Sequence, residues 1–186
     1  MHLPLTATRR APRRTPMIAA LLLACAAVLG PGQAVAHADP VSVTCTGSSA
    51  ITYSPGLTFT PRTSTYAESD AYSSCLSSDP TLTSGSASAS YTSSFSCLGP
   101  LSVSSDSHYT VHWNNGHSST FDLDYTDTIV AGVENVTAIG TVTSGDFTGA
   151  SATFVWLYTA PSPLACLTTT GLTNQTGTVT VTILGT

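Results

Sequence analysis

Short runs in which apolar and polar residues alternate recur from about residue 41 to the end of the chain. The alternation has the period of two that is typical of a β-strand with one buried face. Clusters of Gly, Pro, Ser and Asp separate the runs, as turns would. The pattern predicts strands within residues 41–45, 51–59 (with a turn at Pro55-Gly56), 87–97, 109–113, 121–125, 136–142, 152–158 and 178–184.

These runs predict an all-β protein of about eight or nine short strands whose outer faces carry hydroxyl side chains. Antiparallel sheets that are solvated on one side have this pattern. Two such sheets packed face to face form a β-sandwich, so we expect an immunoglobulin-like or jelly-roll sandwich. The segment 160–166 contains Pro161 and Pro163 and is therefore expected to be a loop or an edge.

The stretch VHWNNGHSST, residues 111–120, predicts a β-hairpin. A two-residue turn at Asn115-Gly116 would place Trp113 and Phe121 on opposite faces of the sheet. A three-residue loop, with Gly116 in the left-handed region, places Tyr109 opposite Phe121 and all large apolar residues on one face. Because a slip of one residue inverts every side chain, the apolar pattern favours the three-residue loop.

Residues 1–38 have the features of a secretory signal peptide. Four arginines precede an apolar core, and AVAHA ends in a small-x-small cleavage pattern. We expect cleavage after Ala38, which leaves a single secreted, extracellular domain of residues 39–186. The apolar core is too short to span a bilayer comfortably, and the residues after Cys25 do not favour a lipoprotein anchor.

Removal of the leader changes the charge balance. The chain from residue 39 holds ten acidic residues and a single basic residue, Arg62, and therefore has a net charge of −9 with neutral His. Such a surface repels nucleic acids and anionic membranes. Solubility comes mainly from hydroxyl groups, because Ser and Thr make up 55 of the 148 residues. The aromatic and β-branched residues nevertheless favour a folded β-protein over a disordered chain.

Four cysteines remain after the leader: Cys45, Cys75, Cys97 and Cys166. In an oxidising compartment they are expected to form two disulfides, and no two are spaced as half of a zinc site. Three pairings are possible. We favour Cys45–Cys97 with Cys75–Cys166, because Cys45 and Cys97 each end a run whose apolar residues point one way.

Several short segments occur in an order that resembles a known group of proteins: TYSPGL, SCLGP, WNNGHSS, GTVTSGDFTGA and PLAC. Together they resemble a family of small secreted actinobacterial proteins. The resemblance implies an exported, disulfide-bonded β-sandwich of unassigned activity, and it implies no catalytic residues.

The run ATFVWLY, residues 152–158, is apolar on both faces. Phe154, Trp156 and Tyr158 share one face, and an exposed aromatic strip of this kind could stack on sugar rings. The competing interpretation is a central strand that is buried on both sides. His117, at the tip of the predicted hairpin, is a further candidate contact.

The sequence favours a protein without catalytic machinery. Ser, His and Asp residues share the outer face of the hairpin, but a flat face provides neither a cleft nor an oxyanion hole. His108, His112, Asp122 and Asp124 are possible metal ligands, but solvated strand faces account for such residues more often, and we expect neither metal nor cofactor. We therefore expect a binding or structural role at the cell surface or in the matrix. A carbohydrate-binding module for cell-wall glycan and a module that binds or inhibits an extracellular protein are the alternatives.

Overall fold

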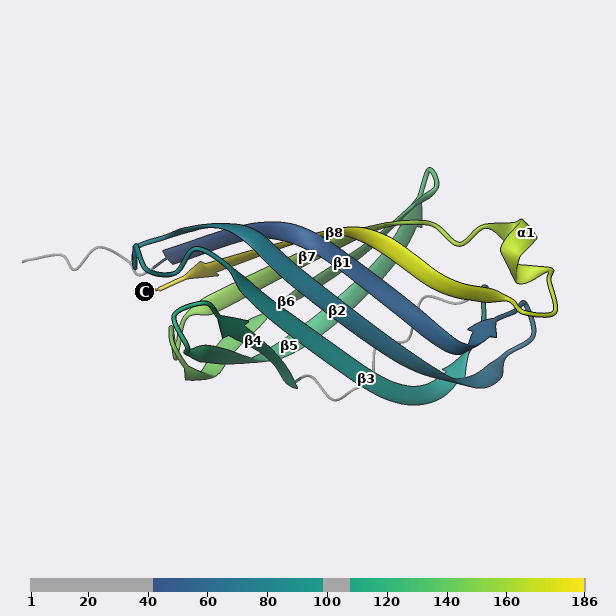
Figure 1. Cartoon of the computed structure of the whole chain (residues 1–186), viewed down its shortest axis with the longest axis horizontal. Helices are drawn as coiled ribbons and strands as arrows, with labels where there is room; N and C mark the ends of the chain where they lie inside the picture. The colour runs from purple at the N-terminus through teal and green to yellow at the C-terminus, as the bar shows by residue number, and fades with distance from the viewer. Residues whose placement is uncertain (1–41, 99–107, 186) are drawn as a thin grey trace, which may run out of the picture. The chain divides into compact units, whose positions relative to one another are not determined.

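The computed structural model describes residues 42–98 and 108–185, and eight β-strands lie within these ranges (Figure 1). In chain order they are β1 (Ser42–Leu57), β2 (Arg62–Ser77), β3 (Gly85–Phe95), β4 (His108–Trp113), β5 (Ser118–Val130), β6 (Val133–Gly145), β7 (Ser151–Thr159) and β8 (Leu172–Leu184). One short helical turn, α1 (Pro163–Cys166), lies between β7 and β8. The segment with the two prolines is therefore a connection and not a strand, as predicted.

The strands form one closed antiparallel barrel, and the expected sandwich is wrong. Each strand pairs with the next along the chain, and β8 pairs with β1 to close the circle. Figure 1 shows β1 lying between β2 and β8. The closing pairing runs from Ser42↔Leu184 to Thr52↔Asn174 and continues at Leu57↔Leu172, so it is as extensive as the hairpin pairings. Closure satisfies the sheet edges that a sandwich would leave open.

Alternation along the strands places one face inside the barrel. All seven tyrosines of the chain point inward, five of them buried and Tyr91 and Tyr125 half-buried. Many of the outward positions carry Ser and Thr, as the sequence predicted. At the end where β1 begins, large apolar side chains fill the interior: Val43, Val111, Trp113, Phe121, Phe154, Val181 and Ile183.

The hairpin between β4 and β5 has the predicted three-residue loop. Tyr109 lies opposite Phe121, and the Trp113 amide donates to the carbonyl of His117 over 2.9 Å. Gly116 has a φ of 86°, in the left-handed region that glycine adopts most easily. Trp113 and Phe121 both point into the barrel, so the apolar pattern identified the correct register.

Two features of the first half of the barrel differ from the prediction. β1 continues through Pro55-Gly56 to Leu57 instead of turning there. The long strand β2 was not predicted, because its inward positions carry tyrosines and carboxylates (Tyr66, Glu68, Asp70 and Tyr72) rather than aliphatic side chains. In the first half of β1, the register with β2 shifts between Thr46 and Gly47. A Cβ atom at Gly47 would overlap the backbone carbonyl of Ala71, so the close approach of the two strands requires glycine there.

The two expected disulfides are present, but the favoured pairing is wrong. Cys45 is bonded to Cys75, and Cys97 is bonded to Cys166. Cys45 and Cys75 are register partners on neighbouring strands, with Cα atoms 4.0 Å apart. Cys97 follows β3 and joins it to the helical turn α1. Which cysteines pair depends on the register between neighbouring strands. The alternation of apolar and polar residues within each strand does not determine that register.

Thiol counting on paired Cys→Ser variants tests this connectivity. In the chain from residue 39, which lacks Cys25, the Cys97→Ser/Cys166→Ser variant should show no free thiol in denaturant, whereas Cys45→Ser/Cys97→Ser should show two. Because the Cys97–Cys166 bridge spans 69 residues, its removal should lower the free energy of unfolding by about 4 kcal/mol in urea titrations. Two free thiols in the first variant would contradict the connectivity.

No helix in residues 42–98 and 108–185 is long and apolar enough to cross a membrane. The predicted signal peptide, its cleavage site and Cys25 lie outside the described residues. Two disulfides fit a protein of an oxidising, extracellular compartment.

Candidate functional site

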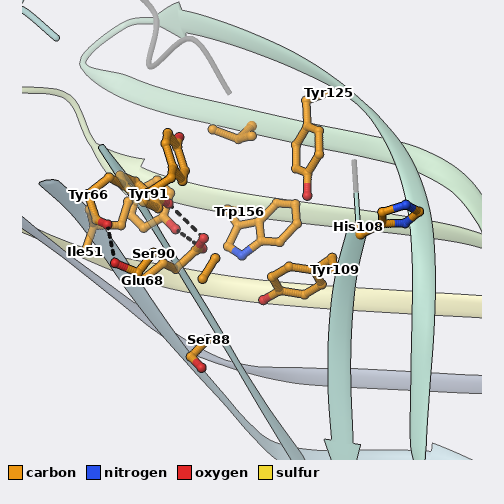
Figure 2. Close-up of a pocket in the computed structure, with 13 residues that line it drawn as sticks. Ile51, Tyr66, Glu68, Ser88, Ser90, Tyr91, His108, Tyr109, Tyr125 and Trp156 are labelled. Carbon is orange, nitrogen blue, oxygen red and sulfur yellow. Dashed lines mark hydrogen bonds between the residues drawn. The ribbon is translucent and has the colours of Figure 1, made fainter. Parts of the chain in front are cut away.

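A cavity of about 210 Å³ lies inside the barrel (Figure 2). Six aromatic side chains from five strands form much of its wall: Tyr66, Tyr91, Tyr109, Tyr125, Trp156 and Tyr158. The remaining lining consists of three apolar residues, two serines, one acid and one histidine: Ile51, Ala89, Val136, Ser88, Ser90, Glu68 and His108. An eight-stranded barrel is just wide enough either to be filled by side chains or to hold one small ligand. In this barrel, side chains fill the apolar end where β1 begins, whereas the part lined by these residues contains the cavity.

Among the described residues, the cavity lining reaches exposed side chains beside β3. Within the described residues, β3 and β4 pair at three positions, from Gly85↔Trp113 to Ala87↔Val111, and then separate. Ser88 and Ser90 point away from the barrel axis, yet they line the cavity, so the cavity extends around this edge of β3. Tyr91 points inward but is only half-buried, which is consistent with an opening at the same place.

Glu68 is the acid of the cavity wall, and it is held by three hydroxyl groups. Tyr66 donates to its Oε2 over 2.8 Å, and Tyr158 donates to its Oε1 over 3.0 Å (Figure 2). The hydroxyl of Ser49 lies 3.3 Å from Oε1. Glu68 points inward and is partly accessible, so its carboxyl group can meet a molecule in the cavity. Burial, and next the charge of Asp70, raise the pKa of Glu68 to about 7.

Asp70 lies beside Glu68 on β2 and fixes the aromatic wall. Its Oδ2 accepts hydrogen bonds from Tyr109 and from the indole of Trp156, each 2.7 Å long, and a longer one of 3.3 Å from Tyr72. Asp70 is buried and is not part of the lining. Burial raises its pKa, whereas these hydrogen bonds oppose that effect. Asp70 therefore positions two rings of the wall from behind.

The rings of the wall contact one another through defined geometries. Tyr109 meets Trp156 edge to face, with centroids 5.9 Å apart and planes at 89°. Tyr125 stacks on the same indole at 6.2 Å and 26°, and Figure 2 shows all three side chains together. Tyr66 and Tyr91 form a second pair at 4.8 Å. The wall is therefore built from packed rings whose positions are set before a ligand enters.

A second buried polar cluster lies on β1, β6 and β8. The amide of Gln175 donates to Glu134 over 2.8 Å, and the hydroxyl of Tyr53 donates to the Gln175 oxygen over 2.7 Å. Burial raises the pKa of Glu134 to about 7. None of these three residues lines the cavity, so this cluster belongs to the structural interior.

The aromatic strip proposed on β7 is not on the surface. Phe154, Trp156 and Tyr158 all point inward and are at most 3% exposed. The prediction that these residues form an exposed strip for stacking on sugar rings is therefore wrong. Neither is β7 buried on both faces, because Leu157 on the outer face is 42% exposed. Trp156 and Tyr158 do contribute to the cavity wall, whereas Phe154 packs in the core between Phe121, Tyr109 and Trp156.

The polar residues of the hairpin lie on its outer face and at its tip. His117 lies exposed at the tip, and its Nδ1 is 2.9 Å from Asp146. His108, His112, Asp122 and Asp124 lie on the outer face, and His108 also borders the cavity. In the part of the chain that the structure describes, no three His, Cys, Asp or Glu side chains gather as a metal site would require.

Sequence reasoning missed Glu68 and Asp70, which define the polar side of the site. The signal was present in YAESDAY, residues 66–72, where tyrosine and acid occupy every second position. Carboxylates are usually solvated, so this run reads as a surface segment. Only the pairing of β2 between β1 and β3 turns these side chains inward.

No protein-family model, no curated protein and no solved structure matches this chain.

Proposed function

We propose that this chain is an exported, non-catalytic binding protein that holds a small organic molecule inside its barrel. The observation that supports this proposal is the cavity, which is open at β3 and lined by ordered rings. A solvated volume of about 210 Å³ corresponds to roughly seven water molecules, which suits a ligand of about seven to ten non-hydrogen atoms. Release of this water and burial of ligand against aromatic rings would favour binding.

A binding role agrees better with the cavity than a hydrolytic role does. Glycoside hydrolysis generally uses two carboxyl groups that both face the substrate. Glu68 faces the cavity, whereas Asp70 is buried behind the wall and is occupied by Tyr109 and Trp156. Among the described lining residues there is one acid and a bordering histidine, and no hydrogen bond joins this histidine to a lining serine as in an activated nucleophile.

Filling the cavity should abolish binding. Ala89 is half-buried and lines the cavity, so the Ala89→Phe side chain would occupy the ligand volume. Ala71→Phe, on the exposed face of β2, is the matched control. Saturation-transfer NMR with a panel of small organic fragments should detect binders for the wild type and for Ala71→Phe, and none for Ala89→Phe.

The indole of Trp156 offers an independent readout, since it forms part of the wall. Fragments that bind should change the tryptophan fluorescence of the wild type, and Trp156→Phe should remove that change while Trp113 still emits. Fragments that bind the wild type and Ala89→Phe equally well would show that the cavity is not the binding site.

A further inference from the structure

We propose that the ligand of this cavity is an organic cation, a small amine or quaternary ammonium compound, which Glu68 and the aromatic wall bind together. This inference rests on the proposed binding function and specifies the ligand class for it. It is carried by the combination of one carboxyl group and several aromatic rings in one cavity, with no Lys or Arg among the described lining residues.

The charge distribution of the interior favours a positive ligand. None of the described lining residues is Lys or Arg, and Arg62 instead donates to the Thr170 carbonyl over 3.0 Å. Glu68 faces the cavity, and Asp70 lies directly behind the wall. An anionic ligand would meet like charge in a medium of low dielectric constant, whereas a cation would meet opposite charge.

The aromatic wall provides the second element of cation recognition. Ring faces carry partial negative charge, and tryptophan and tyrosine attract cations that lie within about 6 Å of the ring centroid. Tyr66 and Tyr91 lie on the side of Glu68, while Tyr109 and Tyr125 flank Trp156. A cation placed between these groups would contact rings from several strands and one carboxylate. A neutral apolar ligand would use the same rings but provide no opposite charge for Glu68.

Glu68 is also arranged so that a bound cation changes its protonation. The three hydroxyl groups of Tyr66, Tyr158 and Ser49 stabilise the ionised carboxylate, whereas burial and Asp70 oppose ionisation. The carboxyl group of Glu68 is therefore protonated below about pH 7. A cation would supply the missing opposite charge and displace the proton.

Other titratable groups surround Glu68, most of them tyrosines. Tyrosines on several strands interact electrostatically with Glu68. Burial raises the pKa values of these tyrosines above the ordinary range, so they stay neutral near pH 7. Asp70 is held by its donors away from the cavity. Within residues 42–98 and 108–185, these groups are Tyr53 on β1, Tyr66, Asp70 and Tyr72 on β2, Tyr91 on β3, Tyr109 and the bordering His108 on β4, Tyr125 on β5 and Tyr158 on β7.

Choline and 3,3-dimethylbutan-1-ol form a matched pair of probes, since they share one shape and differ in charge. Titration calorimetry of the protein should give a dissociation constant for choline that is at least about tenfold lower than that of the neutral alcohol. Glu68→Gln should remove most of this preference and still bind the alcohol, which also reports that the variant is folded. Asp124→Asn, on the exposed face of β5, is the control and should bind as the wild type does.

The pH dependence of choline binding provides a second measurement. Between about pH 5 and 6.5 the affinity should rise by up to about tenfold per pH unit in the wild type, and it should be flat in Glu68→Gln. Equal affinity for the two probes, or tighter binding of the alcohol, would contradict the proposal that the ligand is a cation. Either result would still agree with the proposal that the cavity binds a small molecule. Failure of both probes, together with failure of the fragment panel, would overturn the binding function as well.

Discussion

The free energy of unfolding should fall by several kcal/mol as the pH rises from about 5 to about 8. Glu68 and Glu134 have pKa values of about 7 in the folded protein, against 4.5 for an ordinary glutamate. Between these values the folded chain binds more protons than the unfolded chain, so stability decreases with rising pH. Each group contributes roughly 2 to 4 kcal/mol to this loss, which is complete above about pH 7. Burial raises the pKa of Asp70 as well, which adds a loss of the same sign.

Urea denaturation at fixed pH values measures this effect directly. Glu68→Gln and Glu134→Gln should each reduce the difference between about pH 5 and pH 8, because each removes one buried carboxyl group that must ionise. Asp124→Asn, on the outer face, should leave the difference unchanged. A protein that becomes more stable across this range would contradict the assignment of buried, protonated glutamates.

Trp156→Ala should destabilise the barrel by about 4 kcal/mol. The side chain is 2% exposed and packs against Phe154, Tyr109 and Tyr125. Loss of a buried aromatic side chain of this size costs roughly 3–5 kcal/mol. The change also removes one of the two short hydrogen bonds to Asp70.

Two further variants separate packing from hydrogen bonding at this position. Trp156→Phe keeps a ring but lacks the indole N–H, so it should cost about 2 kcal/mol, near the value for a hydrogen bond to a charged group. Leu157→Ala, on the exposed face of the same strand, should change stability by less than about 1 kcal/mol. Equal unfolding free energies for Trp156→Ala and Leu157→Ala would show that the indole is not part of the core.

Much of the local structure followed from the alternation of residues. The strand runs around Val111, Phe121 and Val181 were placed correctly, and so was the direction in which their side chains point. The hairpin register followed from the requirement that Trp113 and Phe121 share a face. Such predictions succeed because the period of two and a tight turn are properties of neighbouring residues.

The candidate site was only half predictable. Trp156 and Tyr158 were selected as ligand contacts, but on a surface strip rather than on an internal wall. Glu68 was not selected, since an acid within a polar run normally lies in water. What makes it a candidate contact is the cavity around it, which residues from β1 to β7 create together.

The sequence by itself determined an all-β chain, its strand faces, its turn at Gly116 and its two disulfides. The tertiary structure alone decided that β8 returns to pair with β1, that Cys45 meets Cys75, and that Glu68 and Asp70 point inward. A sandwich and a barrel each bury one face of every strand, so both produce the same alternation. They differ in which distant strands pair, and that choice depends on the packing of the whole interior.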